Sequence, residues 1–265
     1  RPSRSRRSVR RSSSRAGCTG AECHHGPVHV EQIWRYPVKS LQGERLGAVE
    51  VGEAGLVGDR SHALRDPATG VVLTARRDPT LLYGRGLLTG DGAVDVPGHG
   101  PTTDVAQISA WVGRPVTLLG PTGESQTYEN LSDPEVDDSD PVAWQGPSWS
   151  YHDSVRTQVS IVAVGDLRHW DVRRFRPNLV VSGDTADGLV GHRIRVGGAE
   201  LDVVKRIDRC VMVTRAQPGG IERDLDVLRT LRHERELTLA VGALVVHPGP
   251  VRTGDPVDDL GPSPT

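Results

Sequence analysis

Short apolar segments bounded by glycine or proline constrain the fold of this chain more than any other feature. The sequence has 31 Gly and 19 Pro residues, which interrupt apolar runs before they reach the length of an ordinary helix. Segments such as VHVEQIW, LGAVEVG, PVTLLG, VSIVAV and NLVVSG predict strands, and GVVLTA and RCVMVT fit the same pattern. We therefore predict a mainly β (α+β) fold with a few short helices.

Local signals also predict one hairpin and two helices. In RIRVGGAELDVV, the dipeptide Gly197-Gly198 stands between two alternating runs, which is typical of a β-hairpin turn. TTDVAQISAWVG begins with Thr and Asp caps, carries apolar residues at helical spacing and stops at Gly113. RDLDVLRTLRHERE places leucines on one helical face, and its charges are expected to face solvent.

The N-terminal segment differs in composition from the rest of the chain. RPSRSRRSVRRSSSRAGC is nearly all Arg and Ser and cannot bury enough apolar area to offset its ordering entropy, so we expect residues 1–27 to be disordered. It lacks the apolar stretch of a secretory signal; contact with RNA or a membrane surface, or a transit peptide, are alternatives. Cys18, Cys23, His24 and His25 follow, but their spacing fits no zinc pattern, and we expect no metal site there.

Charge and cysteine content exclude several classes of protein. Lys and Arg number 32 against 34 Asp and Glu, a formal net charge of -2 that gives no general attraction to nucleic acid or anionic membranes. The 3 cysteines do not form an even disulfide framework, and no apolar run has the length of a membrane span. We therefore expect a soluble, cytoplasmic protein with neither a membrane nor a nucleic acid as its partner.

The 265 residues suffice for one large domain or two small ones. Strand signals fill a region to about residue 120 and a second one from 155 to 262. Between them, SDPEVDDSDPVAWQGPSWS at positions 132–150 is acidic and rich in Pro and Ser, which predicts a long loop within a connecting region over 121–154.

Cations and amides stand at the ends of several apolar segments, in YPVKS, GLVGDR, TARRDP, RFRPNLVVSG and RIDRC. Each cluster alone is typical of a solvated turn. Together they indicate a bound anion, because Arg pairs bidentately with phosphate or carboxylate and Lys adds a point charge. The chain contains no glycine-rich phosphate loop of a standard type.

Cys210 is the single cysteine beyond the N-terminal segment and stands next to Arg209, close to Lys205 and Arg206. An unbroken strand would place Arg209 on the apolar face, so we infer a bulge or a strand end at Asp208-Arg209-Cys210. Nearby cations stabilise a thiolate, which attacks electrophiles or ligates a soft metal. On the residues alone, a thiolate in an anion-binding pocket and a buried structural cysteine are equally supported.

The segments YPVKS, GLVGDR, LTARRDP, RFRPNLVVSG, RCVMVT and GPVRTGDPV, in this order, resemble the MOSC family, named for the C-terminal part of molybdenum cofactor sulfurases. The arrangement is similar to proteins with an N-terminal MOSC β-barrel domain, including the mitochondrial amidoxime-reducing component and its bacterial relatives. The resemblance runs from about His29 to Leu260. It implies an N-terminal MOSC β-barrel domain over 28–120 and a MOSC domain over 155–262, with a molybdenum cofactor (Mo-molybdopterin) in the cleft between them.

The resemblance also implies roles for individual residues. Cys210 matches the cysteine whose sulfur ligates molybdenum, and is the expected metal ligand and catalytic residue. Ser160 matches a position where Ser or Thr opens a helix near the cofactor, and Arg215 stands where relatives often have an acid. The residues that match cofactor-binding positions are Lys39, Ser40, Arg60, Arg76, Ser160, Arg176, Asn178 and Arg209.

The function implied by the resemblance is a two-electron reduction that removes oxygen from a small N-hydroxylated or N-oxide substrate, with the 132–150 loop bordering the substrate opening. Some relatives carry a ferredoxin-like domain that this sequence lacks, so a separate ferredoxin, flavodoxin or cytochrome is the expected electron donor. An alternative is a cofactor or sulfur carrier in which Cys210 bears a persulfide or shields the cofactor. A third is a polyanion-binding protein that uses the Arg/Ser segment.

Overall fold

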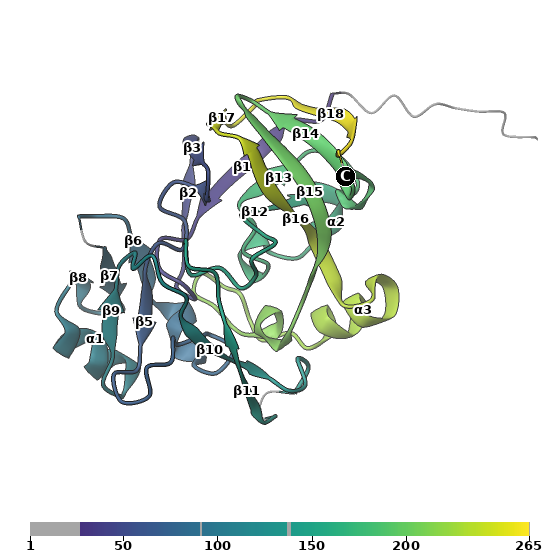
Figure 1. Ribbon diagram of the computed structural model, residues 1–265. Helices are drawn as coiled ribbons and strands as arrows, with labels where there is room; N and C mark the ends of the chain where they lie inside the picture. Colours follow the sequence, from purple (N-terminus) through teal and green to yellow (C-terminus); the bar gives the residue numbers. More distant parts are fainter. Residues whose placement is uncertain (1–26, 91, 137–138, 265) are drawn as a thin grey trace, which may run out of the picture.

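The computed structural model describes residues 27–90, 92–136 and 139–264, and strands dominate it (Figure 1). The largest sheet has eight strands in the order β18-β14-β15-β16-β12-β13-β1-β2 and curls around an aliphatic core. The predicted mainly β (α+β) fold is therefore confirmed. The strands of this sheet are β1 Val30–Arg35, β2 Glu44–Leu46, β12 Val159–Ala163, β13 Leu179–Val181, β14 His192–Val196, β15 Ala199–Asp208, β16 Thr238–His247 and β18 Val257–Pro262.

The large sheet joins distant parts of the chain. Strand β1 lies between β2 and β13, with Ile33 opposite both Leu46 and Leu179. The pair β12–β13 is parallel, whereas the other recorded pairs of this sheet are antiparallel. A smaller sheet, β17-β3-β4, likewise pairs β17 (Gly249–Arg252) with β3 (Ala48–Gly52), which in turn pairs with β4 (Gly55–Leu56). Strands from the N-terminal and the C-terminal parts of the chain therefore pair with each other in both sheets.

A second group of short strands surrounds its own core of Leu, Val and Ile side chains. The predicted helix is α1 (Val105–Val112): the Asp104 carboxylate accepts a hydrogen bond from the Ala106 N–H at 2.8 Å, and Gly113 ends the helix with φ 84°. The other elements here are β5 Ala63–Arg65, η1 Pro79–Tyr83, β6 Arg85–Leu87, β7 Ala93–Val96, β8 Gly100–Thr102 and β9 Thr117–Leu119. The predicted strand in GVVLTA is wrong, because only isolated bridges form there, from Val72 to Arg65 and to Tyr128.

The expected long loop over 132–150 is in part a hairpin. Strand β10 (Thr127–Leu131) pairs with β11 (Pro141–Gln145), and Tyr128 opposite Trp144 stacks on it at 5.0 Å between ring centroids. Aromatic pairs across strands stabilise a hairpin even where the flanking composition is acidic and rich in proline. The acidic composition concealed this strand pair, which lies low in the view of Figure 1.

The expected strand in RCVMVT is also wrong, although the inferred strand end is correct. Strand β15 ends at Asp208, and Val211–Thr214 forms a short 3-10 helix, η4. Arg174 donates to the carbonyl oxygens of Val213 and Arg215 at 3.2 and 3.3 Å and to that of Glu222 at 2.6 Å. These bonds hold the chain in a turn where apolar composition alone indicated a strand.

The remaining elements are short. The second predicted helix is α3 (Asp226–Arg235), and the predicted hairpin joins β14 to β15 through Gly197, which has φ 54°. Three further helical turns are α2 Val164–Leu167, η2 Val172–Arg174 and η3 Asp187–Leu189. No helix in the described part of the chain has the length and apolar character needed to cross a bilayer. Apart from residue 27, the segment 1–27 that was expected to be disordered lies outside the described residues, and so does the cysteine–histidine cluster.

Candidate functional site

A cavity of about 300 Å³ collects cations from segments that lie far apart in the sequence. Its walls come from the turn after β1, the residues after β4, the segment before η1, the 152–157 segment, strand β12, the residues before β13 and the end of β15. The predicted cofactor-binding residues that line it are Lys39, Ser40, Arg60, Arg76, Ser160, Arg176 and Arg209. Motifs separated in sequence thus meet at one place.

Lys39 and Ser40 are placed by the turn that follows β1. The Lys39 ammonium, only 4% exposed, donates to the Tyr151 carbonyl oxygen at 2.9 Å and to the Asp153 carboxylate at 2.6 Å. Burial lowers the pKa of Lys39, and Asp153 opposes this effect. The Ser40 hydroxyl accepts the Ala75 N–H at 2.9 Å, which ties this turn to the segment that carries Arg76.

Arg60 and Arg176 both lie over the Tyr36 ring, at 4.9 and 4.2 Å from its centroid. Arg60 donates to the Asp59 carboxylate and, at 3.1 Å, to the Arg176 carbonyl oxygen. Arg176 donates through Nη1 to the Leu41 carbonyl oxygen at 2.6 Å, while its buried Nη2 has no protein partner. Burial lowers the pKa of Arg176 to about 10, which leaves it charged at neutral pH. A buried, charged donor without a partner indicates an anion in the cavity.

Asn178 does not line the cavity but supports its wall. Its side-chain oxygen accepts from the Ser160 N–H at 3.0 Å and the Ser160 hydroxyl at 2.9 Å, and its amide donates to Asp59 at 2.9 Å. Asp59 also accepts the Tyr36 N–H at 2.7 Å. Ser160 is the second residue of β12 and does not open a helix, so that expectation is wrong; α2 begins at Val164.

Cys210 lines a second cavity of about 390 Å³. The two cavities share Arg76, Asn130, Asp208 and Arg209 in their linings. The thiol sulfur lies 3.4 Å from Nε of Arg76, whose Nη1 donates to the Asn130 side-chain oxygen. The cavities are therefore adjacent, and a ligand in the first can approach the sulfur past the Arg76 guanidinium.

The cation beside the sulfur was not the one that the local sequence indicated. Lys205 donates to Asp208 at 3.3 Å, and Arg206 donates to Glu236 at 2.9 Å. Arg209 directs its guanidinium to the carbonyl oxygens of Leu239 and Phe175. Arg76, 134 positions away in the sequence, supplies the contact instead. Arg209 keeps a charge interaction with Cys210, but its hydrogen bonds go elsewhere because the chain turns after Asp208.

Sequence reasoning missed His152 and Asp153, which line the first cavity. Burial lowers the pKa of His152 to about 3, Arg60 adds to this, and the ring is therefore neutral at pH 7. Burial opposes the charged form of Asp153, but Lys39 and Arg76 outweigh it and hold the pKa of that carboxyl well below its usual range. Both residues follow an irregular segment in which no periodicity indicated a site.

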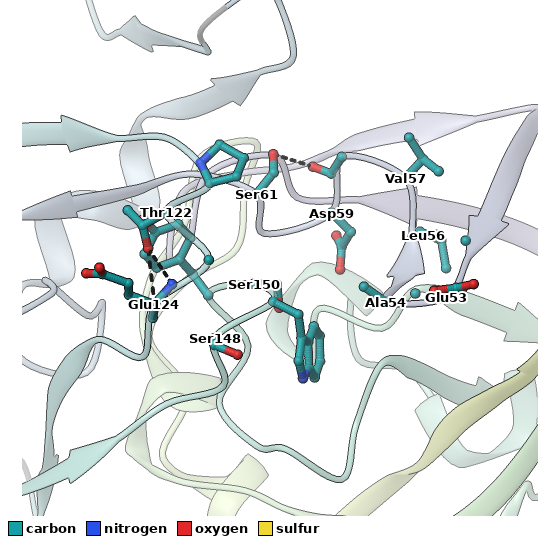
Figure 2. A pocket seen from close by; sticks show the side chains of 17 residues that line it. Glu53, Ala54, Leu56, Val57, Asp59, Ser61, Thr122, Glu124, Ser148 and Ser150 are labelled. Carbon is teal, nitrogen blue, oxygen red and sulfur yellow. Dashed lines mark hydrogen bonds between the residues drawn. The ribbon is translucent and has the colours of Figure 1, made fainter.

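A larger cavity, of about 490 Å³, lies beside Asp59 and differs in chemistry (Figure 2). It is bounded by β3, β4 and the segments 121–124 and 148–151. Figure 2 shows Glu53 and Glu124 toward opposite sides of it, with Asp59 and Ser150 between them. None of the described residues that line it is Lys or Arg, so it does not have the character of an anion site.

The cationic cavity fits a phosphate-bearing cofactor with a soft metal. Buried Lys39 and Arg176 can bind phosphate, and the unpartnered Nη2 of Arg176 offers a donor to it. Cys210 supplies the type of sulfur ligand that a soft metal prefers, at the adjoining cavity. The donor set therefore agrees with a molybdenum cofactor.

Comparison with protein families places most of the chain in one family. Residues 28–112 match the MOSC N-terminal beta barrel domain, and residues 148–258 match the MOSC domain. The chain belongs to the MOSC family. MOSC domains are associated with molybdenum cofactor binding. The β10–β11 hairpin lies between the two matched spans in this MOSC protein.

Solved structures similar to the MOSC protein include the YuaD protein from Bacillus subtilis, at 14% identity over 88% of this chain and 94% of that one, with a TM-score of 0.41. YiiM from Geobacillus stearothermophilus is 14% identical over 45% of this chain and 67% of that one, with a TM-score of 0.33. A hypothetical protein is 11% identical over 88% of this chain and 66% of that one, with a TM-score of 0.39. No curated protein matches the sequence.

Proposed function

We propose that this MOSC protein binds molybdenum cofactor in the cationic cavity and reduces small N-hydroxylated or N-oxide substrates. One observation carries the proposal: residues from five separate motifs, among them Lys39, Arg76 and Arg176, line a cavity adjacent to Cys210. The cofactor, when bound, would supply two-electron removal of oxygen from the substrate. A separate electron-transfer protein of the ferredoxin, flavodoxin or cytochrome type would provide the electrons.

Different residues of the chain would bind different parts of the cofactor. Cys210 would ligate the metal through its sulfur, and Arg76 would hold that sulfur through the 3.4 Å contact. Lys39, Arg60 and Arg176 would bind the phosphate and the pterin. Asn178 would keep Arg60 in place indirectly, because its amide fixes the Asp59 carboxylate to which Arg60 donates.

The substrate would enter at the Cys210 cavity. Leu131 and Pro134 from the hairpin and Leu237 after α3 form an apolar part of its wall, while Asn130 adds a polar group. Small-molecule sites commonly combine an apolar wall with a few polar groups that orient the ligand. This arrangement suits a small, largely apolar molecule whose N-oxygenated end points toward Cys210.

The decisive experiment measures metal and turnover in the same preparations. The full chain is purified from a host that makes molybdenum cofactor, molybdenum is quantified by mass spectrometry, and reduction of an N-hydroxylated amidine is followed with a reduced viologen donor. We expect bound molybdenum and turnover in the parent protein and the loss of both in Cys210→Ala. A Cys18→Ser/Cys23→Ser variant is the matched control and should retain both. Full metal content and full turnover in Cys210→Ala would refute the proposal.

The second candidate is a carrier of cofactor or sulfur. Cys210 is partly exposed and lines an open cavity, so a group bound to its sulfur could be passed to another protein. A carrier would contain cofactor, show no turnover with the viologen donor, and release the cofactor to an acceptor enzyme lacking it. Turnover of the hydroxylated amidine argues against this function.

A further inference from the structure

One carboxylate in the lining of the cationic cavity pairs with a buried cation. Asp153 lines the cavity with its side chain 64% exposed to the open space, and its Oδ1 lies 2.6 Å from the Lys39 ammonium. The residue belongs to the 152–158 segment, which forms no helix or strand. An acid in this position is unexpected, because it repels the anion that the surrounding cations are suited to bind.

Asp153 acts on the cluster as a whole and not only on Lys39. The positive charges of Lys39, Arg76 and Arg60 favour its ionised form, and its negative charge in turn favours the charged forms of Arg176 and Arg209. The other carboxylate in the lining, Asp208, is 78% exposed and pairs with Lys205 at 3.3 Å. Asp153 is thus the carboxylate of the lining that contacts a buried cation directly, and it adds to the charge of Asp59, which pairs with Arg60 behind the wall.

Burying several cations together is unfavourable unless an anion lies among them, since each loses hydration and repels the others. In the protein without ligand, the Asp59 carboxylate provides that anion for Arg60, and Asp153 provides it for Lys39. An incoming phosphate provides more negative charge and also accepts from the unpartnered Arg176 Nη2. Once phosphate is present, the Asp153 carboxylate is a like charge a few ångströms away and weakens binding.

We propose that Asp153 is a built-in counter-anion, which holds the cation cluster together in the cofactor-free protein and is displaced from Lys39 by the phosphate of the entering ligand. The inference rests on the proposed role of the cavity as the phosphate-binding site of the cofactor. It adds that the Asp153 carboxylate stabilises the empty cavity and weakens the binding of the ligand.

The proposal predicts effects of opposite sign for Asp153→Asn in the cofactor-free full chain. Inorganic phosphate, titrated by calorimetry, should bind about tenfold more tightly, because a like charge near the ligand has been removed. The midpoint of thermal unfolding in a buffer without multivalent anions should fall by several degrees, because Lys39 loses its charged partner and keeps only the Tyr151 carbonyl oxygen. A purely structural acid would lower stability without tightening phosphate binding, and an acid that binds the ligand directly would give weaker binding.

Two comparisons complete the test. Asp208→Asn removes the other carboxylate of the lining and should change the phosphate affinity and the midpoint far less. A crystal structure of the parent protein soaked in phosphate should show the ion on Lys39, with Asp153 moved away; it does not depend on the variant folding. Phosphate affinity unchanged or weaker in Asp153→Asn, or phosphate bound with the Lys39–Asp153 pair intact, would overturn the proposal. None of these measurements requires molybdenum or turnover. They therefore test the role of Asp153 separately from the proposed reductase activity.

Discussion

At the scale of single residues, burial decides the protonation state of the histidine in the cavity wall. His152 lies beside Asp59, with 3.4 Å between Nε2 and the carboxylate oxygen, yet burial and Arg60 keep the ring neutral. Asp59 already accepts from Arg60 and Asn178, so it gains little from a protonated imidazole. The wall of the cavity is thus organised around a neutral histidine.

This organisation predicts a loss of stability on acidification. The pKa of His152 falls from 6.5 to about 3 on folding, so the unfolded chain binds the proton more readily between these values. The contribution is fully present above pH 6.5 and is lost as the pH falls toward 3, by at most about 1.4 kcal/mol per pH unit. Urea unfolding between pH 7 and 5 should show this slope, and His152→Gln should flatten it. An equal slope in both proteins would contradict the assignment.

Asn178 should be more important for stability than its lack of contact with the cavity suggests. Asn178→Ala leaves Ser160 and the buried Asp59 with fewer partners, which costs about 2 to 3 kcal/mol for unsatisfied buried polar groups. We expect a lower free energy of unfolding together with weaker phosphate binding, because Arg60 is held through Asp59. Gln126→Ala, which removes only exposed contacts, is the control and should leave both unchanged.

At the scale of elements, the hairpin β10–β11 is the part of the site that the motifs did not reveal. It places Tyr128 under the Lys39 ammonium, at 4.8 Å from the ring centroid, and brings Asn130 to Arg76. The Pro134 carbonyl oxygen accepts the Val211 N–H at 2.8 Å, next to Cys210. The hairpin therefore contacts residues of the cationic cavity and the residue next to Cys210, although it lies outside both matched family spans.

The hairpin should accordingly influence metal retention. Asn130→Leu removes the group that orients Arg76 and should lower the molybdenum content of the purified protein several-fold, while the unfolding midpoint changes little. Thr127→Val is a matched substitution on the same strand that leaves Arg76 untouched, and should keep the parent metal content. The measurement is molybdenum per protein by mass spectrometry. A metal content in Asn130→Leu equal to that of Thr127→Val would rule out this role.

The sequence indicated most of the cations of the candidate site, because they stand in motifs that point to a bound anion when they are taken together. Lys39, Arg60 and Arg176 line the cavity as expected. The short helix after Cys210 and the contact between Arg76 and the sulfur could not be predicted, since both depend on long-range contacts. Asp153 was missed for a related reason: it belongs to an irregular segment, and its role depends on charges from other elements.

At the scale of the whole molecule, the two matched family spans do not correspond to two separate sheets. Strand β1 belongs to the first span but fills the place between β13 and β2 in the large sheet, and β3 of the first span pairs with β17 of the second. The buried Val30 and Ile33 pack in the same core as Ile161 and Leu179. The division into domains at residues 120 and 155 remains a proposal, and the pairing indicates that the units depend on each other.

We expect, for this reason, that a fragment of residues 148–264 does not fold alone. Without β1 it exposes the edge of β13 and loses the apolar contacts of Val30 and Ile33, and exposed apolar strand edges favour aggregation. Soluble yield and circular dichroism test the fragment, and co-expression with residues 27–147 should restore soluble protein if the missing strands are the cause. The full chain should unfold in a single transition by calorimetry. Two separate transitions, or a stable fragment 148–264 with cooperative unfolding, would contradict this expectation. Either result would show that the MOSC part of the large sheet folds without β1.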